Sequence, residues 1–144
     1  MTDPDPPILP TIDALQSLLD KVAARYVSRL SLRVVAVRTG EVELSLPVSA
    51  EIVHGGGVVC GQALMAAADT AMILAVTVAI GGFRPMTTVQ LQTSFLRPVP
   101  GDAPAVVVVA RLLRRGRRLC FGEILLSTPE GGLAAHATTT YALL

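Results

Sequence analysis

Aromatic side chains are scarce in this sequence: tryptophan is absent, and Phe, Trp and Tyr together make up 3% of the 144 residues. Hydrophobic residues nevertheless account for 51% of the chain, so Val, Leu, Ala, Ile and Met must build the core. A small chain this apolar is expected to cover part of its surface with another subunit. We therefore predict one domain over residues 11–144 that forms a homo-oligomer, either a dimer or a tetramer.

Cysteine and net charge are also low. Cys60 and Cys120 are the only cysteines, and they match neither a metal site nor a disulfide framework. A net charge of +1 gives no general attraction to nucleic acid. The first ten residues carry acids and prolines where a signal peptide needs basic residues and an apolar run. We expect a flexible tail over residues 1–10 and a cytoplasmic protein with no metal, no cofactor and no nucleic-acid partner.

The longest apolar stretch runs from His54 to Ile80 and reads HGGGVVCGQALMAAADTAMILAVTVAI. Its apolar character on every side is typical of a buried central helix, although its length would also span a membrane. Gln62, Thr77 and the single carboxylate Asp69 interrupt it, and a charge in the middle of a bilayer is costly. We favour the core helix of a soluble protein, with no membrane partner.

The patterns on either side of this stretch predict an α+β fold. Apolar residues at helical spacing indicate an amphipathic helix over 12–30, with Tyr26 on its apolar stripe. Alternating or β-rich runs indicate strands. The predicted strands cover 32–38, 41–48, 86–96, 104–115, 117–127 and 133–143. A helix, a hairpin, a buried helix and a four-strand meander predict an antiparallel sheet of about six strands curled round the central helix.

Alternation within 86–96 assigns side chains to two faces of one strand. One face is expected to carry Val89, Leu91, Thr93 and Phe95, and the other Thr88, Gln90, Gln92 and Ser94. Gly81 and Gly82 are expected to cap the central helix.

This arrangement, with the glycines before the helix and Asp69 within it, resembles the hotdog-fold acyl-CoA thioesterases of the PaaI-like (phenylacetyl-CoA thioesterase) group. That group belongs to the 4-hydroxybenzoyl-CoA thioesterase superfamily, and the similarity covers residues 30–144. Its signature is a Gly-rich turn containing His-Gly-Gly, then a catalytic Asp on the helix and a later hydroxyl residue. The run GQALMAA in the helix is also similar to the TesB-related thioesterases.

Two alignments to that signature are possible. Matching His54-Gly55-Gly56 to the His-Gly-Gly puts Ala63 where the Asp should be. Anchoring on Asp69 instead keeps the carboxylate and needs no gap. In that register Gly57 and Gly61 match signature glycines and Thr88 falls within one residue of the hydroxyl, while His54, Cys60 and Gln62 replace the Asn, the His and the last Gly. We adopt this second register.

The resemblance implies hydrolysis of an acyl-CoA thioester. Asp69, flanked by alanines, would act as general base or as nucleophile, and the Gly61 backbone N–H would polarise the thioester carbonyl. Thr88 would support the carboxylate, and His54 and Gln62 could orient the water or the carbonyl oxygen. A structural Asp69, a Gly61 required only for close packing and a loop-capping His54 are the alternatives. Cleft sites between two subunits would take the Gly-rich turn from one chain and Asp69 from the other.

Four arginines crowd around Gly116: Arg114, Arg115, Arg117 and Arg118. Guanidinium groups match phosphate geometry, and coenzyme A offers a 3′-phosphate and a pyrophosphate. We assign these arginines, together with Gly55, Gly56 and Gly57, to substrate binding. The alternative is a solvated basic hairpin that protects a sheet edge.

Other functions compete with hydrolysis. A non-catalytic acyl-CoA-binding module would not need the chemistry of Asp69. A hotdog enoyl-CoA hydratase or dehydratase would need a His with a separate acid, and no such pair is evident. The HGGG string also occurs in lipases, but the sequence has no G-x-S-x-G elbow. His136 is expected to be structural, and Cys60 has no paired base at a recognisable spacing.

Overall fold

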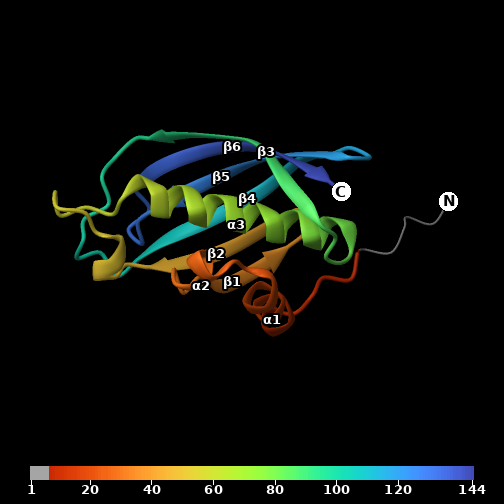
Figure 1. Ribbon diagram of the computed structural model, residues 1–144, viewed down its shortest axis with the longest axis horizontal. Coiled ribbons are helices and arrows are strands. Elements are labelled where there is room, and N and C mark those ends of the chain that lie inside the picture. Colours follow the sequence, from red (N-terminus) through yellow and green to blue (C-terminus); the bar gives the residue numbers. More distant parts are fainter. Residues whose placement is uncertain (1–6) are drawn as a thin grey trace.

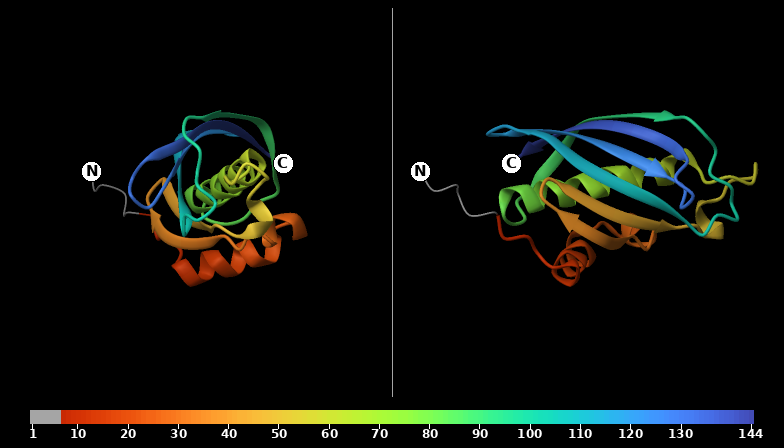
Figure 2. Two further views of the ribbon diagram at one scale, coloured as in Figure 1. Left: turned by 90° about the vertical axis from the view of Figure 1, so that its left-hand side faces the viewer. Right: turned by 180° about the vertical axis from the view of Figure 1, so that it is seen from behind.

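The computed structural model describes residues 7–144 and consists of a curved sheet wrapped around one long helix (Figure 1). Viewed along that helix, the sheet curls around it on one side (Figure 2, left). The predicted α+β class and hotdog fold are therefore confirmed. Most of the predicted N-terminal tail, residues 1–6, lies outside the described residues.

The elements follow one another as the sequence patterns predict, with one exception discussed below. The helices are α1 (Ile12–Val22), α2 (Arg25–Ser28), the 3-10 turn η1 (Ala50–Ile52) and α3 (Gly61–Ile80). The strands are β1 (Arg33–Arg38), β2 (Glu41–Pro47), β3 (Met86–Phe95), β4 (Ala105–Arg115), β5 (Leu119–Ser127) and β6 (Leu133–Leu143).

The six strands are antiparallel and lie in the order β1-β2-β4-β5-β6-β3. The predicted four-strand meander is wrong, because only β4, β5 and β6 follow one another across the sheet. β4 pairs with β2, and β3 lies at the far edge beyond β6. Val106, Val108 and Ala110 of β4 are fully buried, so this strand needs a central place, whereas the Gln- and Thr-rich β3 tolerates an edge.

The apolar stretch 54–80 divides into a loop and a helix. Residues 54–60 form the loop, which turns at Gly57 with φ +78°. α3 then runs to Ile80, and Gly81, with φ +83°, caps it as predicted. By length and composition α3 could cross a membrane, but 67% of its most apolar window is buried inside the fold. That burial is typical of a core helix.

The single helix predicted over 12–30 is wrong. Ala23 and Ala24 are extended, with ψ 138° and 151°, and separate α1 from α2. The break rotates the second part of the segment, so Tyr26 is 62% exposed while Val27 packs against the core. An unbroken helix would keep Tyr26 on the buried stripe, where its hydroxyl would need a partner.

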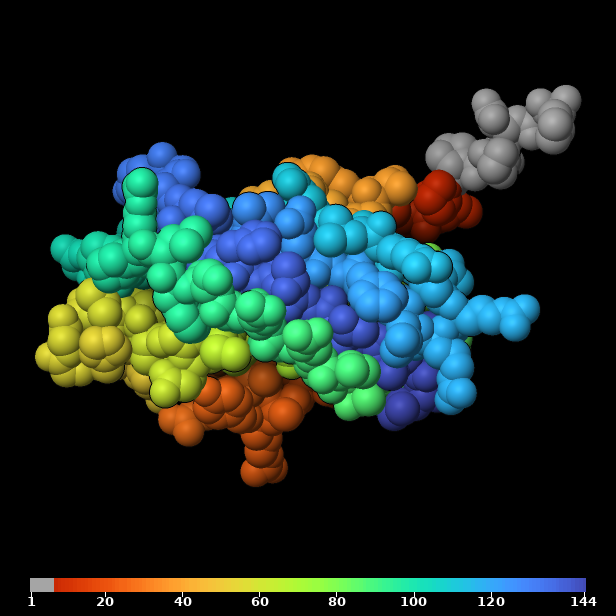
Figure 3. Space-filling view, turned by 90° about the horizontal axis from the view of Figure 1, so that it is seen from above, coloured from red at the N-terminus to blue at the C-terminus, as the bar shows by residue number. Residues whose placement is uncertain are grey.

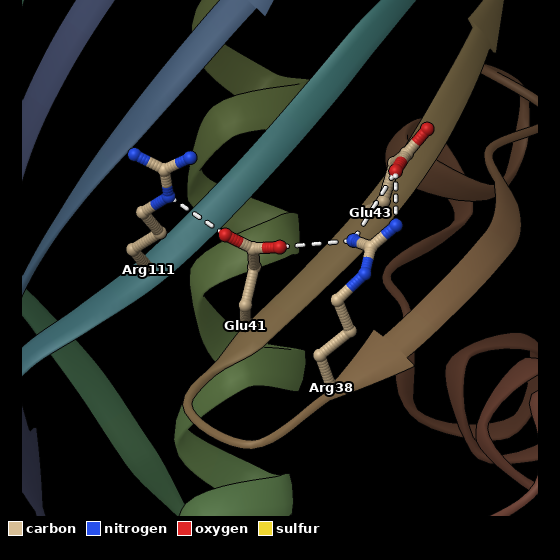
Figure 4. A network of polar contacts seen from close by, with 4 residues as sticks. All are labelled: Arg38, Glu41, Glu43 and Arg111. Atoms are coloured by element: carbon tan, nitrogen blue, oxygen red, sulfur yellow. Dashed lines mark hydrogen bonds and ion pairs between the residues drawn. The ribbon is translucent and has the colours of Figure 1, made fainter.

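Ion pairs join β1, β2 and β4 on the sheet face turned away from α3 (Figure 4). Glu41 accepts hydrogen bonds from Arg38 (2.9 Å) and Arg111 (2.7 Å), and Arg38 also reaches Glu43 (3.3 Å). The hydrogen bond from Arg111 is the main reason that the pKa of Glu41 lies below its ordinary value. Exposed pairs of this kind contribute little to stability.

The two edges of the sheet differ. At β1, the Gln16 side chain of α1 accepts a hydrogen bond from the Val34 N–H (2.8 Å) and donates to the Leu32 carbonyl (3.2 Å). At β3, the sequence from Met86 to Phe95 has no charged residue and no proline. Figure 3 shows this strand in green, running across the surface. An uncharged edge strand on the surface is open to pairing with another strand.

Gly122 of β5 leaves room for α3 to approach the sheet. A Cβ atom there would meet Met72 and lie 2.8 Å from the Arg111 carbonyl oxygen of β4. We expect Gly122→Ala to lower the free energy of unfolding by about 1–3 kcal/mol, because overpacking forces shifts in the core. Urea denaturation measures this change. Gly82→Ala is the control, since a Cβ there has no atom of residues 7–144 within 4 Å. An equal loss in both variants would contradict the packing explanation.

Candidate active site

Asp69 lies in the middle of α3 and is held by two strands of the sheet. Its carboxylate oxygen Oδ1 accepts a hydrogen bond from the Thr88 hydroxyl of β3 (2.9 Å) and another from the Tyr141 hydroxyl of β6. The Tyr141 oxygen also lies 3.0 Å from the Asp69 main-chain carbonyl oxygen. The hydroxyl of the next residue, Thr70, donates instead to the Ala66 carbonyl oxygen of the same helix (2.8 Å). The strands β3 and β6 therefore fix the orientation of the Asp69 side chain.

A β-bulge brings Thr88 to Asp69. The pairing of β3 with β6 shifts between Thr88 and Gln90, so that Thr88 lies opposite Tyr141 and Gln90 opposite Thr140. Residues directly opposite in an antiparallel pair share a face, and Tyr141 faces α3. The prediction that Thr88 shares a face with Gln90 is therefore wrong, because the extra residue Val89 reverses the alternation between them.

Tyr141 contacts Asp69 but is not among the residues predicted from the sequence. It is 1% exposed, and burial, followed by the hydrogen bond with Asp69, raises the pKa of Tyr141 well above its ordinary value. The available signal was the alternation of the last strand, in which Ala137, Thr139 and Tyr141 share one face. A buried tyrosine hydroxyl needs a hydrogen-bond partner, and Asp69 is the partner it finds.

No cation neutralises the Asp69 carboxylate within residues 7–144, since none of the ion pairs there involves it. Its side chain is partly exposed next to the β3 edge. His136 of β6 instead pairs with Glu123 (3.0 Å), in keeping with the structural role expected for it. Asp69 thus combines a fixed orientation with an unpaired negative charge, which is what a general base or a nucleophile requires.

Gly61 is the first residue of α3, where helix geometry leaves backbone N–H groups without an intrahelical partner. The ring of Phe95 covers it: a Cβ on Gly61 would lie 3.1 Å from the Phe95 ring. Beside them is a groove of about 370 Å³ whose lining is mostly apolar and includes Val58, Leu64 and Leu96. Gly61 is therefore a close-packing position that also places a helix-start N–H beside an apolar groove.

The other predicted residues before α3 lie in the loop at its start. His54 is exposed, and its Nδ1 accepts the Gly56 N–H (2.9 Å), so its ring closes the loop. Gly55, Gly56 and Gly57 are exposed around it, and Gln62 is exposed on the first turn of α3. The structure groups these residues with Gly61 and not with Asp69.

The arginine cluster lies at the opposite end of α3. Arg115 donates to the Ala79 carbonyl oxygen in the last turn of the helix (3.0 Å), which satisfies a carbonyl that the helix leaves free. Arg114, Arg117 and Arg118 are exposed on the β4–β5 hairpin, which projects at the right of Figure 3. Arg115 therefore has a structural contact, while the other three present their guanidinium groups to solvent.

The Gly61 N–H and the Asp69 carboxylate lie far apart along α3. Asp69 follows Gly61 by eight residues, which corresponds to about 12 Å along a helix rising 1.5 Å per residue. A single thioester carbonyl cannot contact the Gly61 N–H and the Asp69 carboxylate of the same chain at hydrogen-bond distance. Within residues 7–144, no cluster of three or more His, Cys, Asp and Glu residues has a geometry that could hold a metal ion.

Known proteins resemble this chain in sequence and in architecture. The family model of the thioesterase superfamily matches residues 51–135. The "Putative esterase TV1331" of Thermoplasma volcanium is 30% identical over 115 residues, covering 74% of this chain and 78% of that protein.

Two solved structures illustrate the likeness in three dimensions. The thioesterase HI1161 of Haemophilus influenzae superposes with a TM-score of 0.84 at 22% identity, covering 96% of this chain and 93% of that one. A point mutant of the phenylacetic acid degradation protein PaaI from Thermus thermophilus superposes with a TM-score of 0.74 at 26% identity, covering 84% and 100%. These matches confirm the predicted hotdog fold and the predicted likeness to PaaI.

Proposed function

The chain belongs to the thioesterase superfamily, and from this premise we propose that it hydrolyses an acyl-CoA thioester to the free acid and coenzyme A. The observation that carries the proposal is the Asp69 carboxylate, which two hydroxyl groups orient and which no cation among residues 7–144 neutralises. The likeness to PaaI, a protein of phenylacetic acid degradation, supports a coenzyme A thioester as the substrate class.

Asp69 can serve this reaction in two ways. As a general base it takes a proton from water while the water oxygen bonds to the thioester carbonyl carbon; the C–S bond then breaks and the proton passes to the leaving thiolate. As a nucleophile, its oxygen bonds to that carbon and expels the thiolate, and water then hydrolyses the resulting anhydride. In both cases a donor such as the Gly61 N–H stabilises the negative charge that develops on the carbonyl oxygen.

We further propose that two copies of the chain share each site. The separation of about 12 Å between Gly61 and Asp69 means that one chain cannot supply both groups to one thioester. The uncharged β3 edge, with Thr88 and Asp69 beside it, is the surface through which a second copy would pair. A two-fold arrangement would then bring Gly61 of one copy to Asp69 of the other.

The direct test uses purified protein, a panel of acyl-CoA thioesters and a thiol reagent. Release of free coenzyme A by the wild type, and not by Asp69→Asn, is the expected result. Mass spectrometry of the reaction separates the alternatives. Intact acyl-CoA bound to the protein without turnover would indicate a binding module, and an enoyl-CoA substrate that gains one water would indicate a hydratase.

The exposed arginines are proposed to bind the coenzyme A phosphates. Replacing Arg117 and Arg118 together with Ala is expected to raise KM for acyl-CoA by about three- to tenfold, since exposed charge pairs contribute on the order of 1 kcal/mol or less each. kcat should change little, because a phosphate contact stabilises the bound substrate and the transition state equally. Steady-state kinetics measures both constants.

Two controls test the phosphate assignment. The effect should disappear with a pantetheine thioester, which lacks the nucleotide phosphates. Replacing Arg25 and Arg33 together with Ala should leave KM at the wild-type value, because these arginines are exposed elsewhere on the surface. A rise in KM that is equal for both substrates would reject phosphate binding by this hairpin.

A further inference from the structure

The two oxygens of the Asp69 carboxylate have different surroundings. Oδ1 accepts the hydrogen bonds of both Thr88 and Tyr141. The hydrogen bonds formed among residues 7–144 include none to Oδ2. An oxygen that accepts two donors has less electron density available for a new bond than an oxygen that accepts none. Oδ2 is therefore the oxygen better able to take a proton from water or to attack the thioester carbonyl carbon.

The two donors to Oδ1 are not equivalent. Thr88 lies on the edge strand β3 and is exposed in the single chain, so its hydroxyl is the less enclosed of the two donors. Tyr141 is 1% exposed and lies on β6, between β5 and β3, so water cannot readily replace it. Its hydroxyl also lies 3.0 Å from the Asp69 main-chain carbonyl oxygen, which ties the side chain to the helix turn that carries it.

The Tyr141 hydroxyl holds its proton more tightly than an ordinary tyrosine does. Burial and the neighbouring Asp69 carboxylate raise the pKa of its hydroxyl well above the usual value for tyrosine. A hydroxyl that keeps its proton can donate, and Oδ1 is the carboxylate oxygen that it contacts.

We propose that Tyr141 is a positioning residue that holds Asp69 through Oδ1 and directs Oδ2 to the thioester or to the attacking water. This inference rests on the proposed catalytic role of Asp69. Tyr141 does not touch the substrate in this arrangement. It acts by fixing the rotamer of Asp69 and by stabilising its charged form.

The test is Tyr141→Phe, which keeps the buried ring and removes only the hydroxyl. We expect kcat to fall about 10- to 100-fold, the range for losing a hydrogen bond to a charged group, with a smaller change in KM. The acid limb of the pH–kcat/KM profile should also move to higher pH. A carboxylate that loses a donor binds its proton more tightly, so the inactive protonated form persists to higher pH. A merely structural tyrosine would not move this limb.

Tyr26→Phe is the matched control, because Tyr26 is the other tyrosine of the chain and is 62% exposed. It should keep the wild-type kcat and pH profile. The double variant Asp69→Asn/Tyr141→Phe should lose no more activity than Asp69→Asn alone, because the two residues act as one unit.

The outcomes separate this inference from the proposed function. Wild-type turnover in Asp69→Asn would overturn the proposed function itself. Loss of turnover in Asp69→Asn together with a wild-type kcat and pH profile in Tyr141→Phe would overturn the positioning role alone.

Fluorotyrosine provides a second test that does not depend on the folding of Tyr141→Phe. In the Tyr26→Phe background, incorporation of 3-fluorotyrosine labels position 141 only. A fluorinated phenol is a stronger donor, so the acid limb should move to lower pH, opposite to the Phe variant. An unmoved limb, or one moved to higher pH, would contradict the positioning role.

Discussion

Asp69→Asn is expected to lower kcat for acyl-CoA hydrolysis by about 10²–10⁴-fold, the usual contribution of a positioned proton-transfer group. The amide oxygen of Asn can still accept the hydrogen bonds of Thr88 and Tyr141, so the fold and the orientation of the side chain should survive. What is lost is the negative charge and with it the ability to take a proton or attack the carbonyl. KM should change far less, because the carboxylate is needed chiefly in the transition state.

Two measurements accompany this variant. Urea denaturation should give a free energy of unfolding close to that of the wild type. Asp13→Asn, an exposed substitution in the first turn of α1, should keep full activity. If Asp69→Asn were destabilised but its folded fraction turned over at the wild-type rate, Asp69 would be structural and the active site would have to be sought elsewhere.

Gly61→Pro is expected to lower kcat by about 10²–10³-fold, the usual effect of removing one oxyanion-hole donor. Proline is well tolerated at the first position of a helix, where the N–H has no helical partner. Cys60, which precedes it, is extended with φ −69° and ψ 146°, the conformation that a residue before proline prefers. The substitution therefore removes the N–H and leaves the helix able to form.

Gly61→Ala is the matched control for this variant. Either residue places a Cβ against the ring of Phe95, 3.1 Å away, but only proline removes the N–H. We expect Ala to cost some activity and stability through this close contact and Pro to cost much more in kcat. Equal kcat values for the two variants would show that Gly61 matters only for packing.

Mixing the two inactive variants tests whether the site is shared. Co-expressed Asp69→Asn and Gly61→Pro chains form mixed dimers in which one site combines the intact Gly61 of one chain with the intact Asp69 of the other. With random pairing, roughly a quarter of the wild-type activity should return. Sites built within single chains would give no recovery, and a stable, active monomer in light scattering would equally reject the shared site.

The sequence by itself determined the six strands, the central helix and its single carboxylate. Strict alternation in Val42, Leu44 and Leu46, all fully buried, and glycines at the turns are local signals that act between near neighbours in the chain. The apolar run ending at Gly81 specified a buried helix, and its lone carboxylate, Asp69, marked the candidate site because an unexplained charge in such a run needs a partner or a function.

The tertiary structure alone decided which groups meet. The bulge at Val89 turns Thr88 towards Asp69 against the alternation of its own strand, because the register is set by β6 and not by the residues of β3. Tyr141 reaches Asp69 across 72 residues of chain, a contact that no local pattern encodes. β4 takes its place beside β2 because its buried valines need two neighbours. Contacts between segments distant in sequence arise only when the packed core fixes their relative positions, and the candidate site consists of such contacts.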